Sequence, residues 1–79
     1  MEAYVLVNTE PNALWSVAEG ALKIDGVRTA HAVTGQVDAV VLVEFPKMEY
    51  LARIIDRIQK LKGVQRTQTL MAVPCPIRE

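Results

Sequence analysis

Blocks of apolar and polar positions along the chain predict six secondary-structure elements. Segment 39–43 (Ala-Val-Val-Leu-Val) is apolar throughout, rich in β-branched residues and too short to span a membrane, so it predicts a buried strand. Segment 3–7 (Ala-Tyr-Val-Leu-Val) is apolar in the same way. A strand with one face in water alternates apolar and polar residues, so we expect both faces of these two strands to be covered.

Two other segments have the period of an amphipathic helix. The stronger one begins after Phe45-Pro46-Lys47, where proline breaks the strand, and Lys62-Gly63 ends it. Its apolar positions are Leu51, Ile54, Ile55, Ile58 and Leu61. The weaker one is expected to be capped by Thr9 or Asn12 and to end at Asp25-Gly26. Its apolar stripe is Leu14, Val17, Ala18, Ala21 and Leu22, and it contains the helix-weakening Gly20.

Strands are also predicted over segments 27–33 and 64–73, the first joined to segment 39–43 by a hairpin at Thr34-Gly35. The two halves of the chain then repeat one another, because segments 3–7 and 39–43 match and Gly26-Val27 matches Gly63-Val64. Each half is strand, helix, strand. Two such halves predict an α+β, ferredoxin-like β-α-β-β-α-β fold, with a four-stranded antiparallel sheet that carries both helices on one face.

The other face of that sheet has no cover within a single domain of residues 1–79. Its strands are apolar on both sides, so a monomer would expose a patch larger than soluble monomers tolerate. A chain this short also buries only about 60% of its unfolded surface. Two copies placed sheet to sheet remove the patch, and we therefore predict a homodimer with the form of a dimeric α/β barrel.

Composition narrows the possible partners. Nine basic and nine acidic residues cancel, which argues against direct binding to nucleic acid or to an anionic membrane. Cys75 has no companion for a disulfide and Met1-Glu2-Ala3 does not resemble a secretory signal, so a cytoplasmic protein is expected, with Cys75 as an incidental thiol. His31 has no metal-ligand companions, and neither a metal nor another cofactor is predicted.

The polar turn before segment 39–43 offers the best candidate ligand site. Asp38 stands where the turn ends, so its carboxylate either closes the turn or points at a ligand. Thr67 and Thr69 lie on one side of the last strand because side chains alternate with period two. An amino acid suits such groups: Asp38 can accept from its ammonium, while backbone N–H groups at Gly35 and the threonine hydroxyls can donate to its carboxylate. A purely structural role for these residues remains an alternative.

Segments 33–43 (Val-Thr-Gly-Gln-Val-Asp-Ala-Val-Val-Leu-Val) and 62–69 (Lys-Gly-Val-Gln-Arg-Thr-Gln-Thr) together resemble the effector domain of the Lrp/AsnC family of feast/famine transcriptional regulators. The Gly-x-x-Asp turn is a weak motif alone, but its spacing before a Gly-Val strand with two alternate threonines is fairly specific, and the likeness covers nearly the whole chain. Full members carry an N-terminal helix-turn-helix domain. This chain starts at the first strand and resembles a stand-alone effector module, which is not expected to bind DNA by itself.

The resemblance implies sheet-to-sheet dimers that assemble into larger rings or octamer-like particles, with a small effector, usually an amino acid, bound between dimers. It also makes full-length relatives expected partners. The ligand-binding residues carried over are Gly35, Gln36, Val37 and Asp38 from the turn and Thr67 and Thr69 from the last strand. Many relatives have an aromatic residue where this chain has Val37.

Two other functions are consistent with the same sequence. Dimeric ferredoxin-like barrels also serve as monooxygenases and isomerases, for which His31, Glu44 and Trp15 would be the candidates. Glu44 near a strand end more often reaches water or pairs with a basic neighbour such as Arg66, and Trp15 more often packs in a core or an interface. The third possibility is a pure assembly module that joins oligomers of full-length relatives. The interpretation we favour is a non-enzymatic, amino-acid-binding module involved in transcriptional regulation.

Overall fold

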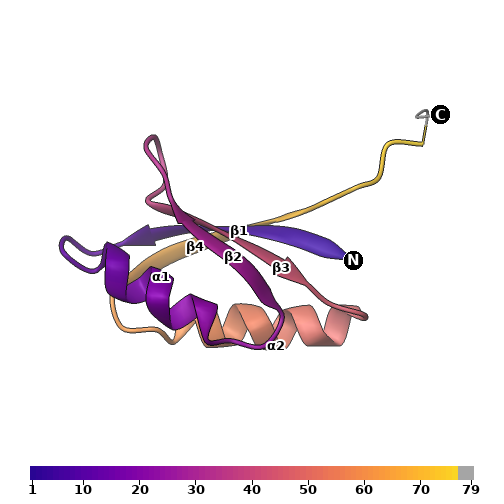
Figure 1. Cartoon of the computed structure of the whole chain (residues 1–79), viewed down its shortest axis with the longest axis horizontal. Coiled ribbons are helices and arrows are strands. Elements are labelled where there is room, and N and C mark those ends of the chain that lie inside the picture. Colours follow the sequence, from indigo (N-terminus) through magenta and orange to yellow (C-terminus); the bar gives the residue numbers. More distant parts are fainter. Residues whose placement is uncertain (77–79) are drawn as a thin grey trace.

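Six elements follow one another in a computed structural model that describes residues 1–76. They are β1 (Glu2–Thr9), α1 (Leu14–Leu22), β2 (Val27–Ala32), β3 (Ala39–Glu44), α2 (Met48–Gln59) and β4 (Val64–Met71). The strands form one antiparallel sheet in the order β2-β3-β1-β4, and both helices lie on the same side of it (Figure 1). The ferredoxin-like fold expected from the sequence is confirmed.

The core lies between this sheet and the helices. Alternate residues of β1 and β3 are completely buried there, which is the period-two pattern of a strand with one inward face. They are Ala3, Val5, Val7, Ala39, Val41 and Val43. From the helices, α1 contributes Val17, Ala18 and Ala21, and α2 contributes Leu51, Ile54 and Ile58. These apolar contacts supply most of the driving force for folding, because burial of apolar area is the dominant favourable term.

Within residues 1–76 nothing covers the opposite face of the sheet, which is apolar at its centre. In the strand register, Tyr4 of β1 lies between Leu42 and Leu70, and the next residue on that face, Leu6, lies beside Val40. Tyr4 and Leu70 are 40% and 43% exposed. We call this set of five residues the open face. It is the surface for which the sequence pattern predicted a cover from a second molecule.

The internal repeat has a physical counterpart in the sheet. The central pairing of β1 with β3 joins Ala3 to Val43, Val5 to Val41 and Val7 to Ala39, so it is symmetric about its midpoint. Both helix-to-strand connections contain a glycine with positive φ, +97° at Gly26 and +99° at Gly63. Their carbonyls accept hydrogen bonds of 2.8 Å from the backbone N–H groups of Glu44 and Glu10, just where β3 ends and just after β1. Each half of the chain is thus fastened to the other in the same way.

Helix α1 departs from the sequence expectations at three positions. Its first turn follows Ala13 without a side-chain cap, and Asn12 has a φ of +68°, so the predicted cap by Thr9 or Asn12 is wrong. Gly20 is explained by packing, because a Cβ there would lie 2.9 Å from Cδ2 of Leu61. Trp15 is 72% exposed and therefore does not pack in the core.

The ends of the elements show smaller differences. The last strand stops at Met71, two residues earlier than predicted, and the backbone N–H of Ala72 donates to the carbonyl of Glu2 at 3.0 Å. The chain beyond it extends away from the sheet, and Cys75 there is exposed (Figure 1). Neither helix between residues 1 and 76 has the length and apolar character needed to cross a membrane.

Candidate functional site

A loop of residues 33–38 joins β2 to β3 and projects beyond the sheet (Figure 1). The Val33 N–H donates to the Asp38 carbonyl at 3.0 Å and closes its base. Gly35 has a φ of +125°, which L side chains rarely adopt, yet a Cβ there would have no heavy atom within 4 Å. This glycine is therefore needed for the backbone conformation, and its surroundings are open to solvent or to a ligand.

Asp38 fastens the loop to β1. Its own N–H donates to the Val7 carbonyl at 2.9 Å, and its carboxylate Oδ2 accepts a 2.8 Å hydrogen bond from the Thr9 N–H. On the neighbouring side, the Asn8 side-chain amide donates to the Gln36 carbonyl at 3.0 Å. The loop is thus held by contacts to β1 before any ligand arrives, which reduces the ordering cost of binding.

A polar hollow of about 400 Å³ lies between this loop and β4. We call it the loop hollow. Its lining residues are Asn8, Gln36, Val37, Gln65, Arg66, Thr67 and Gln68. Side chains of this kind offer amide, hydroxyl and guanidinium donors together with amide acceptors, so the hollow suits a small polar or zwitterionic ligand.

Three of the six residues predicted for the site line this hollow, namely Gln36, Val37 and Thr67. Thr67 and Thr69 are the register partners of the buried Val7 and Val5, so both face the helix side of the sheet. They share one side of β4, as expected. Thr67 Oγ1 accepts a 3.0 Å hydrogen bond from the Gln59 amide. Gly35 shapes the loop, and Asp38 holds it to β1.

Sequence reasoning did not assign the other residues of the hollow. Asn8 and Arg66 are brought together because they are register partners in β1 and β4. The predicted fold places those strands side by side, but the exact register is not encoded in a local motif. Among the described lining residues, Arg66 carries the one formal positive charge of the hollow.

The structural role of Asp38 leads to a stability prediction. Asp38→Ala should lower the free energy of unfolding by about 1–3 kcal/mol, because the partly buried Thr9 N–H would lose its acceptor. Asp38→Asn retains an acceptor oxygen and should cost less than about 1 kcal/mol. Urea denaturation at one protein concentration measures both. Asp25→Ala, at an exposed position, is the control, and equal midpoints for Asp38→Ala and this control would contradict the role.

The candidates for an enzyme lie apart. His31 is exposed and pairs with Val40 on the open-face side of the sheet, Glu44 is at the far end of β3, and Trp15 is on α1, which covers the opposite face. Glu44 forms an ion pair with Arg28 of the neighbouring strand β2, so the suggested pairing with Arg66 is wrong. Arg66 is two strands away, because β1 and β4 lie on the other side of β3.

A ferredoxin-like sheet with one uncovered face and a polar hollow beside its hairpin is compatible with a small ligand-binding domain, although the fold alone does not specify a function. The sequence model of the Lrp/AsnC ligand binding domain matches residues 2–77, and the chain belongs to this family of regulatory effector-binding domains. A search of curated proteins found no match.

Solved structures agree with this assignment. TTHA0845 from Thermus thermophilus is 32% identical with a TM-score of 0.89, over 98% of each chain. E. coli AsnC, at 21% identity and a TM-score of 0.85, shares the fold over 99% of this chain and 54% of its own. The transcriptional regulator NMB0573 from Neisseria meningitidis, solved as a complex with L-Met, is 23% identical with a TM-score of 0.81 over 99% of this chain and 52% of its own. The chain therefore spans about half the length of these two regulators.

Proposed function

We propose that the protein is an amino-acid-binding and self-assembling module of transcriptional regulation, without catalytic activity of its own. The observation that carries this proposal is the loop hollow, in which a pre-formed loop and the edge strand β4 present polar groups around a cavity of about 400 Å³. Membership of a ligand-binding regulatory family supports the same interpretation. The L-Met complex of NMB0573 makes amino acids the first ligands to test.

The groups around the hollow complement both charges of an amino acid. The Arg66 guanidinium can hold the carboxylate through two parallel hydrogen bonds, the geometry that arginine favours. Asp38 does not line the hollow but ends the loop beside it, and its carboxylate can accept from the ammonium, since a carboxylate has about four acceptor positions and Thr9 occupies one of them. Gln36 would contribute backbone groups and Thr67 its hydroxyl, because both line the hollow. Gly35 and Thr69 are their neighbours in the loop and in β4 and do not line the hollow themselves. Val37 then offers an apolar surface to the ligand's side chain.

Assembly follows from the open face. Two copies that pair these sheets would cover the apolar centre formed around Tyr4 and Leu6, and a domain of 79 residues gains from that burial because its own core is small. Such a dimer leaves the loop hollow at the rim, where a second dimer can close it. Larger assemblies and full-length relatives are therefore proposed partners. With nine basic and nine acidic residues, the chain itself should not bind DNA measurably at physiological salt.

A calorimetric titration with L-methionine and a panel of other amino acids tests ligand binding. We expect saturable binding of at least one of them without chemical turnover. Asp38→Asn keeps the shape of the side chain but removes its charge, so affinity should fall by about 1.5–3 kcal/mol, roughly ten- to a hundredfold. Glu19→Gln removes an equal charge from an exposed position of α1, away from the loop and from β4, and should leave affinity unchanged.

The outcomes separate the alternatives. Equal affinities for wild type and Asp38→Asn would refute the carboxylate contact. Turnover of a bound compound would favour a dimeric α/β-barrel enzyme. Oligomers that form normally but bind none of the panel would favour a pure assembly module.

A further inference from the structure

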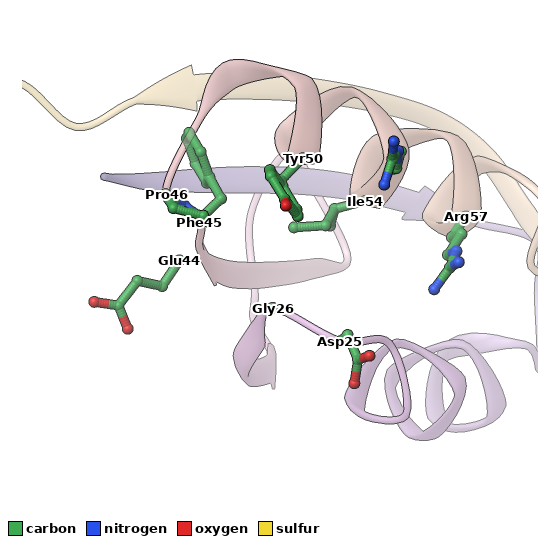
Figure 2. A pocket seen from close by; sticks show the side chains of 9 residues that line it. Asp25, Gly26, Glu44, Phe45, Pro46, Tyr50, Ile54 and Arg57 are labelled. Atoms are coloured by element: carbon green, nitrogen blue, oxygen red, sulfur yellow. The ribbon is translucent and has the colours of Figure 1, made fainter.

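A second cavity lies at the end of β3 opposite the loop hollow. It has a volume of about 230 Å³ and sits between α2 and the connection from α1 to β2 (Figure 2). We call it the end cavity. Its lining residues are Asp25, Gly26, Glu44, Phe45, Pro46, Tyr50, Arg53, Ile54 and Arg57. Since the loop hollow and the end cavity flank opposite ends of β3, one ligand of this small size cannot occupy both.

The inner wall of the end cavity is apolar and firmly packed. Phe45 and Ile54 are 2% and 6% exposed, and the ring of Tyr50 stands beside them (Figure 2). Gly26 lets the backbone come close, because a Cβ there would lie 2.6 Å from Cδ1 of Ile54. The wall is therefore pre-formed, as in most small-molecule sites.

The rim of the end cavity is positively charged. Arg53 and Arg57 lie on the same face of α2, and within residues 1–76 neither takes part in an ion pair. The Arg53 guanidinium lies 5.5 Å from the centroid of the Tyr50 ring, which holds it over the apolar wall.

Acidic residues of the lining only partly offset this charge. The Glu44 carboxylate is neutralised by Arg28 and points out of the cavity (Figure 2). Asp25 is the remaining acidic side chain of the lining. Two arginines against this one aspartate leave a net positive charge beside an apolar wall.

The internal repeat shows that the fold does not require these side chains. When the halves are aligned on Gly26 and Gly63, the hydrogen bonds of the two helix ends coincide: Ile24 N–H to Ala21 carbonyl at 3.0 Å corresponds to Leu61 N–H to Ile58 carbonyl at 3.1 Å. In this alignment Tyr50, Arg53 and Arg57 correspond to Ala13, Ser16 and Gly20. The same chain thus builds the same junction once with small residues and once with an aromatic and two arginines.

We propose that the end cavity is a binding site for a small organic carboxylate that carries an apolar or aromatic group. The carboxylate would lie between the guanidinium groups of Arg53 and Arg57, which donate paired, charge-assisted hydrogen bonds. The apolar group would lie against Phe45, Ile54 and the Tyr50 ring. The volume is below the roughly 300–1,000 Å³ of drug-sized ligand sites, which selects a ligand with a single ring or a short chain.

Phenylacetate is the probe for this site, and phenethylamine, with the same ring and the opposite charge, is its matched control. We expect phenylacetate to shift the backbone amide NMR signals of Gly26 and Tyr50 in a saturable way, and phenethylamine to leave them unchanged. Arg57→Gln should weaken phenylacetate binding roughly tenfold, the loss of one charge-assisted contact, and Arg53→Gln should act similarly. Lys60→Gln removes a positive charge from the C-cap of the same helix, outside the cavity, and should have no effect.

Selectivity in the wild-type protein tests the proposal even if a variant misfolds. Equal shifts with both probes, or equal affinities in Arg57→Gln and Lys60→Gln, would overturn it. Shifts confined to the loop, at Gly35 and Gln36, would also overturn it, because the carboxylate would then bind in the loop hollow. The outcome is independent of amino-acid binding at that hollow, which the same spectra report separately.

Discussion

Leu6→Asp is expected to convert the protein from a dimer to a monomer or to unfold it. Leu6 is at the centre of the open face, beside Val40 and Gln68 on the two neighbouring strands. In the proposed sheet-to-sheet dimer its side chain would lie in a dry interface, where an unpaired carboxylate is strongly unfavourable. We expect the dissociation constant to rise at least a hundredfold, or about 3 kcal/mol, and light scattering after size exclusion to give the monomer mass.

Leu22→Asp is the matched control for this change. Leu22 is on α1, on the opposite side of the sheet, and is 52% exposed. The same substitution there should leave the mass and the thermal midpoint nearly unchanged, because exposed positions usually tolerate a change of this kind. An unchanged dimer mass for Leu6→Asp, or a monomeric wild-type protein at micromolar concentration, would refute the sheet-to-sheet dimer.

Ile58→Ala should remove most of the stability of the fold. Ile58 belongs to α2, and its side chain is among the largest that are completely buried. This side chain lies in the core between the helix and the sheet. Truncating such a residue costs about 2–5 kcal/mol, since transfer free energy is lost and a cavity remains. Small domains lie near the lower end of the usual range of about 5–15 kcal/mol, so the variant should unfold at much lower urea concentration or fail to fold.

The neighbouring Ile55 provides the comparison. It is only half buried on the same helix, so Ile55→Ala should cost clearly less. Both variants must be measured at one protein concentration, because the proposed dimerisation would add to apparent stability. Similar urea midpoints for the two variants would show that Ile58 is less important to the core than its burial indicates.

The fold was predictable because segments 3–7 and 39–43 need cover on both faces. A chain of this length has two helices to offer, and right-handed connections in the two strand-helix-strand halves place both helices on the same side of the sheet. Which residues face the helices was not predictable, since Val5 and Leu6 are both apolar. The structure buries Val5 completely and leaves Leu6 on the open face. Which of these two residues faces the helices depends on the strand register, which local patterns do not specify.

The partner of Glu44 shows a similar limit. The predicted hairpin places β2 beside β3. A basic residue of β2 is therefore a closer partner for the Glu44 carboxylate than Arg66 of β4. The particular residue, Arg28, lies at a register shift between Val27 and Thr29, an irregularity with no sequence signal that we recognised. Local rules also failed at Asn12, because the helix begins at Leu14 after Ala13, without a polar side-chain cap, and Asn12 has a positive φ.

The role of the predicted residues in ligand binding stays a prediction, but their position in the fold was predictable in part. The glycine loop and β4 do meet, and Gln36, Val37 and Thr67 line one hollow. The contributions of Asn8 and Arg66 required the register of β1 with β4. The end cavity was not predicted, because Arg53 and Arg57 look like an ordinary solvated helix face until the packing of Gly26 against Ile54 is known.

The exposed Trp15 gives the protein a built-in optical reporter. It is the single tryptophan of the chain, so the intrinsic fluorescence excited at its absorption edge comes from one known position on α1. The proposed pairing of open faces would take place on the other side of the sheet and would leave this indole in water. Any stage of assembly that brings α1 against another subunit would shift the Trp15 emission to shorter wavelength. The emission wavelength therefore distinguishes contacts through α1 from contacts through the open face, without an added label.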